Sequence, residues 1–157
     1  MATRREVASW IAALALLPAA IGWSHGAAAQ PLPAPRMPPG RARVWFVRLY
    51  EPYVSLATPM MFVNGSPLGA SVPGTVFYRD FPPGTYTFSV ASYGIDYGQA
   101  PTVPLRPGEE LYFIVWCDTF WASGRFFQRD TFYVLPIPPP TAWQYMRLPE
   151  MRDLGAR

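Results

Sequence analysis

The stretch that decides the fold spans residues 77–90, FYRDFPPGTYTFSV, in which two prolines and a glycine separate two apolar runs. Pro82-Pro83 has fixed φ angles and no backbone N–H to donate, so the chain is expected to turn there. Tyr86, Phe88 and Val90 alternate with small polar residues, which predicts a strand with one face in the core. The stretch therefore predicts two β-strands joined at a corner.

Arg79 and Asp80 stand immediately before this corner and raise the question of a reactive charge pair. Adjacent residues on a strand face opposite sides of the sheet, so these two side chains cannot act as one constellation. Turns favour Asp because its carboxylate accepts local backbone hydrogen bonds. We therefore interpret Arg79 as solvated and Asp80 as closing the turn.

A second turn signal, Asn64-Gly65, follows the apolar run MMFV and predicts a tight hairpin, because both residues tolerate positive φ angles. Pro67 in the returning segment cannot donate to a neighbouring strand, which indicates a sheet edge. The same reasoning places strands or short extended pieces at residues 43–50, 60–63, 66–69, 75–81, 85–90, 102–105, 109–117 and 126–135.

About seven strands separated by turn signals predict an all-β fold. We expect a single immunoglobulin-like or prealbumin-like antiparallel β-sandwich over residues 41–136. The run 111–117, LYFIVWC, is apolar on both pleat faces, so it is expected to be a central strand covered on two sides. Cys117 is the only cysteine and is expected to be a small buried residue on that strand.

The first 29 residues have the pattern of an export signal peptide. Two arginines precede the apolar run 7–23, and the alanines at 27–29 offer a cleavage site before Gln30. We expect a periplasmic or secreted protein without an integral membrane segment after cleavage; an uncleaved anchor is the alternative. Residues 30–40, QPLPAPRMPPG, are expected to form an extended Pro-rich linker outside the core.

Residues 137–157 form a second Pro-rich segment, the C-terminal tail. Thr141 and Gln144 have the spacing of a helix capping box behind three prolines, so one short helix to about Leu148 is predicted. Trp143 is among the apolar side chains of this helix, which either pack back on the sandwich or dock a partner. Packing back is expected, since exposed apolar patches are disfavoured on monomers.

The distribution of charge argues against nucleic acid as a partner. The thirteen basic residues are all arginine and are scattered, and against ten acids they give a net charge of only +3. Phosphate binding needs a basic face, which this pattern lacks. No metal or other cofactor is expected, because the Cys/His spacing of a metal site is missing. The expected partners are an envelope protein or a polysaccharide, and the oligomeric state is left open.

Catalysis is not expected from the residues available. The only histidine, His25, lies in the predicted signal peptide, so Cys117 would have no histidine base. Glu109 and Glu110 are neighbours expected to face opposite sides, and no spacing pairs the other acids across a cleft. We therefore predict that the chain is not an enzyme; a hydrolase with an unrecognised site is the least favoured hypothesis.

Aromatic residues in two predicted loops form the candidate binding site. Residues 93–100 contain Tyr93, Asp96 and Tyr97, and residues 118–125 contain Asp118, Phe120, Trp121 and Arg125. Loops gather at the ends of a sandwich, so the two are expected to come together. Flat aromatic faces beside carboxylates suit sugar rings and also protein hot spots. The alternative is that these rings cap the ends of the core.

Two of the turn motifs resemble those of known families. Residues 62–69, FVNGSPLG, resemble the hairpin of PEGA-type domains in bacterial surface proteins. Residues 77–88 resemble the Pro-Gly-x-Tyr-x-apolar hairpin shared by those domains and by carboxypeptidase-regulatory-like, prealbumin-type sandwiches. The resemblance covers about residues 42–117 and extends to uncharacterised small bacterial envelope proteins. Unlike the usual lipoprotein members, this chain has no cysteine just after its N-terminal apolar run.

The resemblance implies an adhesive, structural or accessory module of the cell envelope and supplies no catalytic residues. Together with the export signal, it leads us to expect an exported, non-catalytic binding or structural accessory module. The alternative is a carbohydrate-binding module that uses the loop aromatics.

Overall fold

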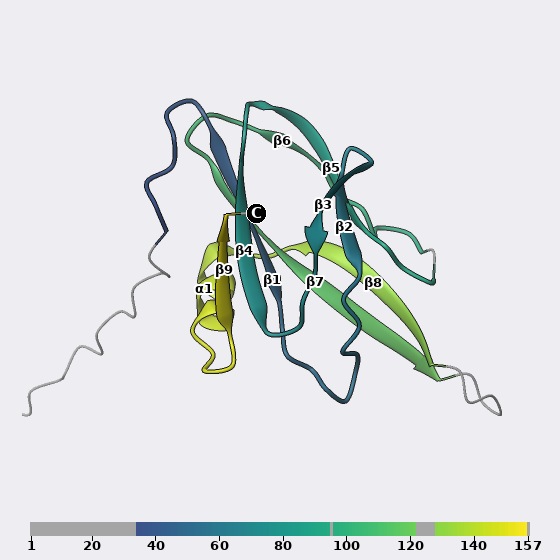
Figure 1. The fold of residues 1–157 in the computed structure, drawn as a ribbon. Helices are drawn as coiled ribbons and strands as arrows, with labels where there is room; N and C mark the ends of the chain where they lie inside the picture. Colours follow the sequence, from purple (N-terminus) through teal and green to yellow (C-terminus); the bar gives the residue numbers. More distant parts are fainter. Residues whose placement is uncertain (1–33, 95, 122–127, 157) are drawn as a thin grey trace, which may run out of the picture.

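The computed structural model describes residues 34–94, 96–121 and 128–156, which form two facing β-sheets and one short helix (Figure 1). Sheet A has the strand order β8-β7-β1-β4-β9, and sheet B has the order β3-β2-β5-β6. The strands are β1 (Ala42–Arg48), β2 (Met60–Val63), β3 (Ser66–Ala70), β4 (Thr75–Phe81), β5 (Gly84–Val90), β6 (Thr102–Leu105), β7 (Glu110–Trp121), β8 (Gln128–Pro136) and β9 (Arg152–Ala156), and the helix is α1 (Pro139–Met146). The predicted all-β sandwich with a short C-terminal helix is confirmed.

The two turn motifs have different roles in the fold. Pro82-Pro83 carries the chain from β4 in sheet A to β5 in sheet B. Because β4 pairs with β1 and β9 while β5 pairs with β2 and β6, the motif is a corner, as predicted, and not the hairpin that the resemblance implied. Asn64 and Gly65, with φ angles of 48° and 79°, do join β2 and β3 in a hairpin. Pro67 lies on β3, an edge strand, as predicted.

Aromatic side chains dominate the core between the two sheets. The ring centroid of Phe46 on β1 lies 5.1 Å from Phe77, 5.4 Å from Phe88 and 6.0 Å from Phe113. Such pairs each add about 0.5–1.5 kcal/mol beyond the burial of their area. Cys117 is buried in the same core, which confirms its prediction as a small buried residue.

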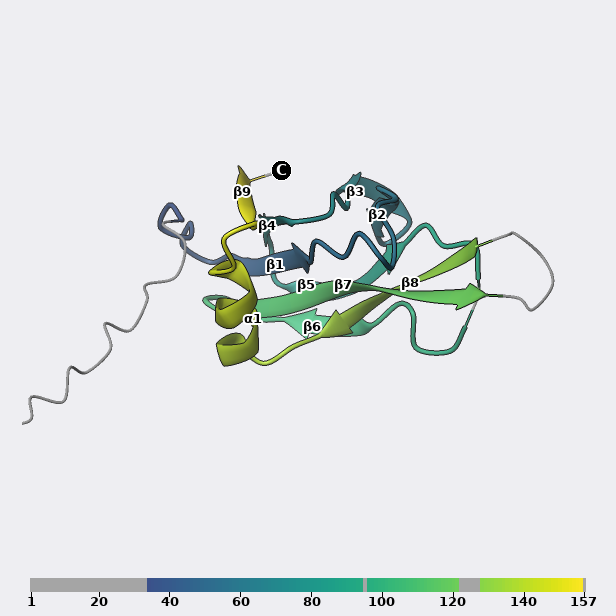
Figure 2. The same cartoon turned by 90° about the horizontal axis from the view of Figure 1, so that it is seen from below.

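Sheet A is covered on its outer face as well, so β1 is buried along its whole length. Trp45 and Val47 on β1 and Tyr78 on β4 pack with Ala142 and Met146 of α1. In both ribbon views α1 lies far from the tip where β7 ends and β8 begins, and the other end of β8 leads directly into it (Figures 1 and 2). The C-terminal tail therefore packs back on the sandwich, as predicted.

The helix begins earlier than its capping-box prediction. Its N-cap is Pro138, with no side-chain cap, and Pro139 occupies the first helical position. Proline suits that position because its fixed φ angle is helical and no N–H is needed there. The predicted start at Thr141 is therefore wrong. Within the described ranges, no helix is long and apolar enough to cross a membrane.

Three features of sheet A depart from the predicted arrangement. β7 continues to Trp121, so residues 118–121, predicted as a loop, belong to a strand. β9 has no counterpart in the prediction and pairs in parallel with β4 at the edge of the sheet. β1 and β7 are also parallel, so the sandwich combines antiparallel and parallel pairs.

The loop between β5 and β6 covers the edge of β8. The backbone N–H of Phe132 donates to Ser92 Oγ at 2.8 Å, and Gln99 Nε2 donates to the Phe132 carbonyl at 3.0 Å. The N–H of Val134 donates to the Gln99 carbonyl at 3.0 Å. These bonds satisfy backbone groups that an open edge would expose, and they tie the two sheets together.

Arg48 is buried inside the sandwich with only 2% of its surface exposed. Its Nη1 donates to the Val115 carbonyl at 3.1 Å, and its Nη2 donates to the Ser55 carbonyl at 3.2 Å. Burial lowers the pKa of Arg48, while the nearby Cys117 favours its charged form. Because Ser55 also donates to Asp130 on β8, this polar cluster fastens the β1–β2 loop to the sheet.

Candidate ligand-binding pocket

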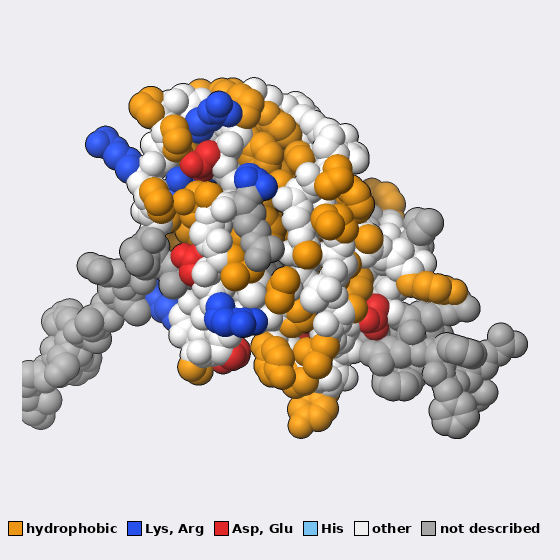
Figure 3. All heavy atoms as spheres, viewed as in Figure 1, with side chains coloured by type: hydrophobic (Ala, Val, Ile, Leu, Met, Phe, Trp, Pro, Cys, Tyr) orange, Lys and Arg blue, Asp and Glu red, His pale blue; other side chains and the backbone are white. Residues whose placement is uncertain are grey.

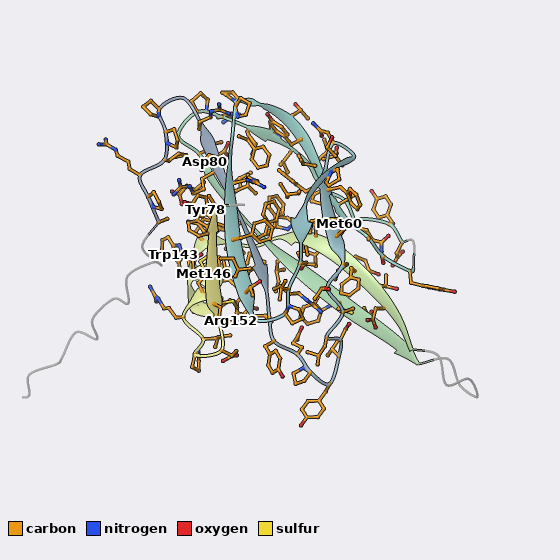
Figure 4. All side chains as sticks on the ribbon, in the orientation of Figure 1. Met60, Tyr78, Asp80, Trp143, Met146 and Arg152 are labelled. Atoms are coloured by element: carbon orange, nitrogen blue, oxygen red, sulfur yellow. The ribbon has the colours of Figure 1, made fainter. Side chains whose placement is uncertain are left out.

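A pocket of about 370 Å³, here named the aromatic pocket, opens on the outer face of sheet A. It is lined by Arg43 and Trp45 of β1, Glu110 and Tyr112 of β7, Trp143 and Met146 of α1, and residues 34–37. Figure 4 shows Trp143 and Met146 on the same side of the molecule as Tyr78 and Asp80 of β4. The volume is near the lower end of the range typical of small-ligand sites, about 300–1,000 Å³.

Arg43 forms one wall of the aromatic pocket. Its Nε and Nη2 donate to the two carboxylate oxygens of Asp80 at 2.7 and 2.8 Å, and its Nη1 donates to the Pro35 carbonyl at 2.7 Å. The guanidinium also lies 4.1 Å from the ring centroid of Tyr78. The hydrogen bonds to Asp80 raise the pKa of Arg43, so the side chain stays charged although it is buried.

The contacts of Asp80 and Arg79 correct both sequence interpretations. Asp80 does not close the turn; it pairs with Arg43, which lies directly opposite on β1. Arg79 is not simply solvated, because its Nη2 reaches sheet B and donates to the Leu68 carbonyl at 3.3 Å. The expectation that the two side chains face opposite sides of β4 is confirmed. Sequence reasoning could not identify partners so distant along the chain.

Glu110 brings a carboxylate to the rim of the aromatic pocket. Its Oε2 accepts hydrogen bonds from the Tyr112 hydroxyl at 2.7 Å and from the Trp45 indole at 3.3 Å. Burial and the bond to Glu110 raise the pKa of Tyr112 to about 12, so this hydroxyl keeps its proton. The Trp143 indole donates in turn to the Tyr112 hydroxyl at 3.4 Å. The network fixes one carboxylate among three aromatic rings.

A smaller, mainly apolar cavity of about 190 Å³ adjoins this site, and we name it the apolar hollow. It is lined by Val103, Leu111, Phe113, Pro136, Ile137 and Pro139, and it shares Glu110 and Tyr112 with the aromatic pocket. The two cavities therefore meet along the first residues of β7.

The charges of the aromatic pocket are unequally available to a ligand. The guanidinium of Arg43 is bound to Asp80 and is nearly inaccessible. Glu110 and Arg36 are exposed, so a ligand would meet these two charges first. Aromatic rings beside a fixed carboxylate suit ligands with an apolar face and a hydrogen-bond donor or positive charge at its edge.

The first group of predicted site residues lies on the β5–β6 loop, away from the aromatic pocket. Tyr97 is 97% exposed and Tyr93 is 67% exposed, so these rings do not cap the core. Asp96 accepts a hydrogen bond at 2.8 Å from the hydroxyl of Tyr133 on β8. This bond lowers the pKa of Asp96 and raises that of Tyr133. The structure thus adds Tyr133, which sequence reasoning missed, to this surface.

The second predicted group is only partly described. Asp118, Phe120 and Trp121 lie on β7 rather than in a loop, and the side chains of the last two fall outside the described residues, as does Arg125. Asp118 is exposed and acts electrostatically on Tyr133, which brings it near Asp96. A further exposed ring, Trp116, stands directly opposite Tyr133 in the sheet. Sequence reasoning could not single out Trp116, because it lies within the run 111–117, which is apolar on both pleat faces.

The surface view shows no concentration of positive charge on the side that it presents. Arginine and acidic side chains lie at separate positions among hydrophobic and uncharged groups (Figure 3). In the described part of the chain, no three His, Cys, Asp or Glu side chains gather as a potential metal site. Comparison with known protein families and with curated proteins finds no match for this chain.

Proposed function

We propose that this chain is an exported, non-catalytic binding module of the bacterial cell envelope and that its ligand occupies the aromatic pocket. The observation that carries the proposal is the carboxylate of Glu110, held by Tyr112 and Trp45 beside the ring of Trp143. A preformed cavity with apolar walls and few fixed polar groups is the usual form of a ligand site. The export part of the proposal rests on the signal-peptide pattern of residues 1–29.

The arrangement of the acids supports binding rather than hydrolysis. Glycoside hydrolysis needs two carboxyl groups placed on opposite sides of the scissile bond. Among the described residues, Glu110 is the only acid that lines the aromatic pocket, and the nearby Asp80 is fixed to Arg43 by two hydrogen bonds. Asp80 therefore cannot serve as a mobile proton donor while that pair is intact.

A second candidate is carbohydrate binding at the tyrosine edge, the surface formed by Tyr93, Asp96, Tyr97 and Tyr133. The exposure of Tyr97 and the bond between Asp96 and Tyr133 favour it, because sugars stack on exposed rings beside carboxylates. The tyrosine edge is an open surface, whereas the aromatic pocket is a cavity lined by other residues. Ligand binding at the two sites should therefore be reduced by substitutions at different residues.

Binding to purified peptidoglycan and to soluble polysaccharides separates these candidates. Co-sedimentation and tryptophan fluorescence would be measured for the wild type, Trp143→Phe and Tyr97→Ala. If the ligand occupies the aromatic pocket, only Trp143→Phe is expected to lower the binding affinity. If it occupies the tyrosine edge, only Tyr97→Ala is expected to do so. Envelope binding that neither substitution affects would contradict both assignments.

A further inference from the structure

The aromatic pocket and the apolar hollow lie on the two sides of Tyr112, and both reach Glu110. We propose that together they form one groove for an extended, proline-rich peptide that carries an arginine or lysine. The inference rests on the proposed binding function, because it names a partner for the same site. Three features of the described residues support it.

The first feature is the open side of β7 at its start. β8 pairs with β7 from Phe113 onward, and the N–H of Ile137 still donates to the Tyr112 carbonyl at 2.9 Å before the chain turns toward α1. Glu110 and Leu111 therefore border the apolar hollow instead of a strand on this side. An extended peptide fits such an edge because its backbone runs alongside the strand while alternate side chains enter the two cavities.

The second feature is the match between aromatic walls and proline. The rings of Trp45 and Tyr112 are almost parallel, with an interplanar angle of 4° and centroids 6.3 Å apart, and Trp143 completes the wall. Proline-rich segments dock in aromatic-lined grooves because their extended form costs little entropy to order. The chain shows a related contact within itself: residues 34–37 line the aromatic pocket, and the Pro35 carbonyl accepts a bond from Arg43.

The third feature is charge. Glu110 is exposed, and its Oε2 is oriented by Tyr112 and Trp45 at the junction of the two cavities. Arg43 acts on Glu110 only through its charge, because its guanidinium donates its hydrogen bonds to Asp80 and to the Pro35 carbonyl. A guanidinium or ammonium group of the peptide would therefore pair with Glu110 while adjacent prolines occupy the cavities on either side.

The probe is the fluorescein-labelled peptide Pro-Leu-Pro-Ala-Pro-Arg, which repeats residues 31–36. Its anisotropy would be followed during titration with the whole chain, in the wild type and in Glu110→Gln. The amide keeps acceptors for Tyr112 and Trp45 but loses the charge, so about tenfold weaker binding is expected. Glu109→Gln is the matched control and should bind as the wild type does. Replacing the peptide arginine by glutamate should weaken binding about as much as Glu110→Gln.

Absence of saturable binding at about 1 mM peptide, the weak limit of specific recognition, would overturn the inference. Equal affinities of Glu110→Gln and Glu109→Gln would also overturn it, because the charge of Glu110 would then contribute nothing to peptide binding. Thermal unfolding of each variant shows whether the fold is intact. If the peptide does not bind while Trp143→Phe still reduces binding to peptidoglycan or polysaccharide, the proposed function is supported and the peptide groove is ruled out.

Discussion

Arg43 on β1 and Asp80 on β4 form a two-point ion pair, with Nε–Oδ1 and Nη2–Oδ2 distances of 2.7 and 2.8 Å. The same guanidinium also binds the Pro35 carbonyl and lies over Tyr78. One side chain therefore joins two strands to the segment that lines the aromatic pocket. Arginine suits this role because its planar fork makes several directed hydrogen bonds at once.

Removing the carboxylate of Asp80 should destabilise the fold. In Asp80→Ala, Arg43 remains 3% exposed but unpaired, and breaking such a buried pair typically costs about 3–5 kcal/mol. Because Asp80 itself is 19% exposed, we expect a loss near the lower end, about 3 kcal/mol, by urea denaturation. The double variant Arg43→Met/Asp80→Leu should recover most of the lost free energy of unfolding, because it leaves no buried charge without a partner. A loss below about 0.5 kcal/mol in Asp80→Ala, the size of a surface effect, would contradict the assigned role.

Tyr112 should make stability fall at high pH. Its pKa is raised from 10.0 to about 12, so the unfolded chain releases this proton at lower pH than the native state. The protonated Tyr112 hydroxyl makes its full contribution to the free energy of unfolding below pH 10. This contribution is lost as the pH rises toward 12, by about 1.4 kcal/mol per pH unit at most. Urea titrations from pH 9 to 12 should give a steeper decline for the wild type than for Tyr112→Phe. Equal slopes would show that the hydroxyl is not protected.

The bond between Tyr133 and Asp96 should be visible in an NMR titration. It lowers the pKa of Asp96, so the carboxylate favours the folded state above its ordinary pKa, and this effect is lost as the pH falls through the lowered value. Tyr133→Phe should raise the pKa of Asp96 toward 3.8, although the bond from the Tyr97 backbone remains. Tyr86→Phe is the control: the Tyr86 hydroxyl donates to the Pro82 carbonyl and not to Asp96, so this variant should leave the pKa of Asp96 unchanged. An unaltered pKa in Tyr133→Phe would remove Tyr133 from the tyrosine edge.

The β2–β3 turn offers a test of backbone geometry alone. Gly65 has a φ angle of 79°, and a Cβ atom built there would meet no heavy atom within 4 Å. Gly65→Ala should therefore cost about 1–2 kcal/mol purely through left-handed backbone strain. Ser66→Ala, at the exposed next position, should cost less than about 0.5 kcal/mol. Equal stabilities of the two variants would argue against this turn conformation.

The sequence was informative wherever local chemistry determines the backbone. The end of β4 followed from the prolines after Phe81, and the β2–β3 hairpin followed from Asn64-Gly65. β9 could not be predicted in the same way, because the residues RDLGA carry no strand pattern and pair through their backbone with β4. Met151, immediately before β9, packs in the cluster that contains Ala142 and Met146 of α1, and such a tertiary contact has no local sequence signal.

The aromatic pocket was beyond sequence reasoning for a related reason. Trp45 and Tyr112 belong to uninterrupted apolar runs, so alternation could not show that both face the outer side of sheet A. Their alignment depends on the parallel pairing of β1 with β7, and Trp143 reaches them from the separate helix. Exposed Tyr93 and Tyr97 were easier to identify, because they lie in a loop between turn residues.

The binding of purified peptidoglycan and of the proline-rich peptide by Trp143→Phe and by Trp116→Phe tests the central claim most directly. Both rings lie on the outer side of sheet A, but only Trp143 lines the aromatic pocket. If the pocket holds the ligand, Trp143→Phe should weaken binding about tenfold while Trp116→Phe retains wild-type affinity and both variants keep the wild-type melting temperature. Equal affinity of the two variants, or a loss confined to Trp116→Phe, would contradict the account.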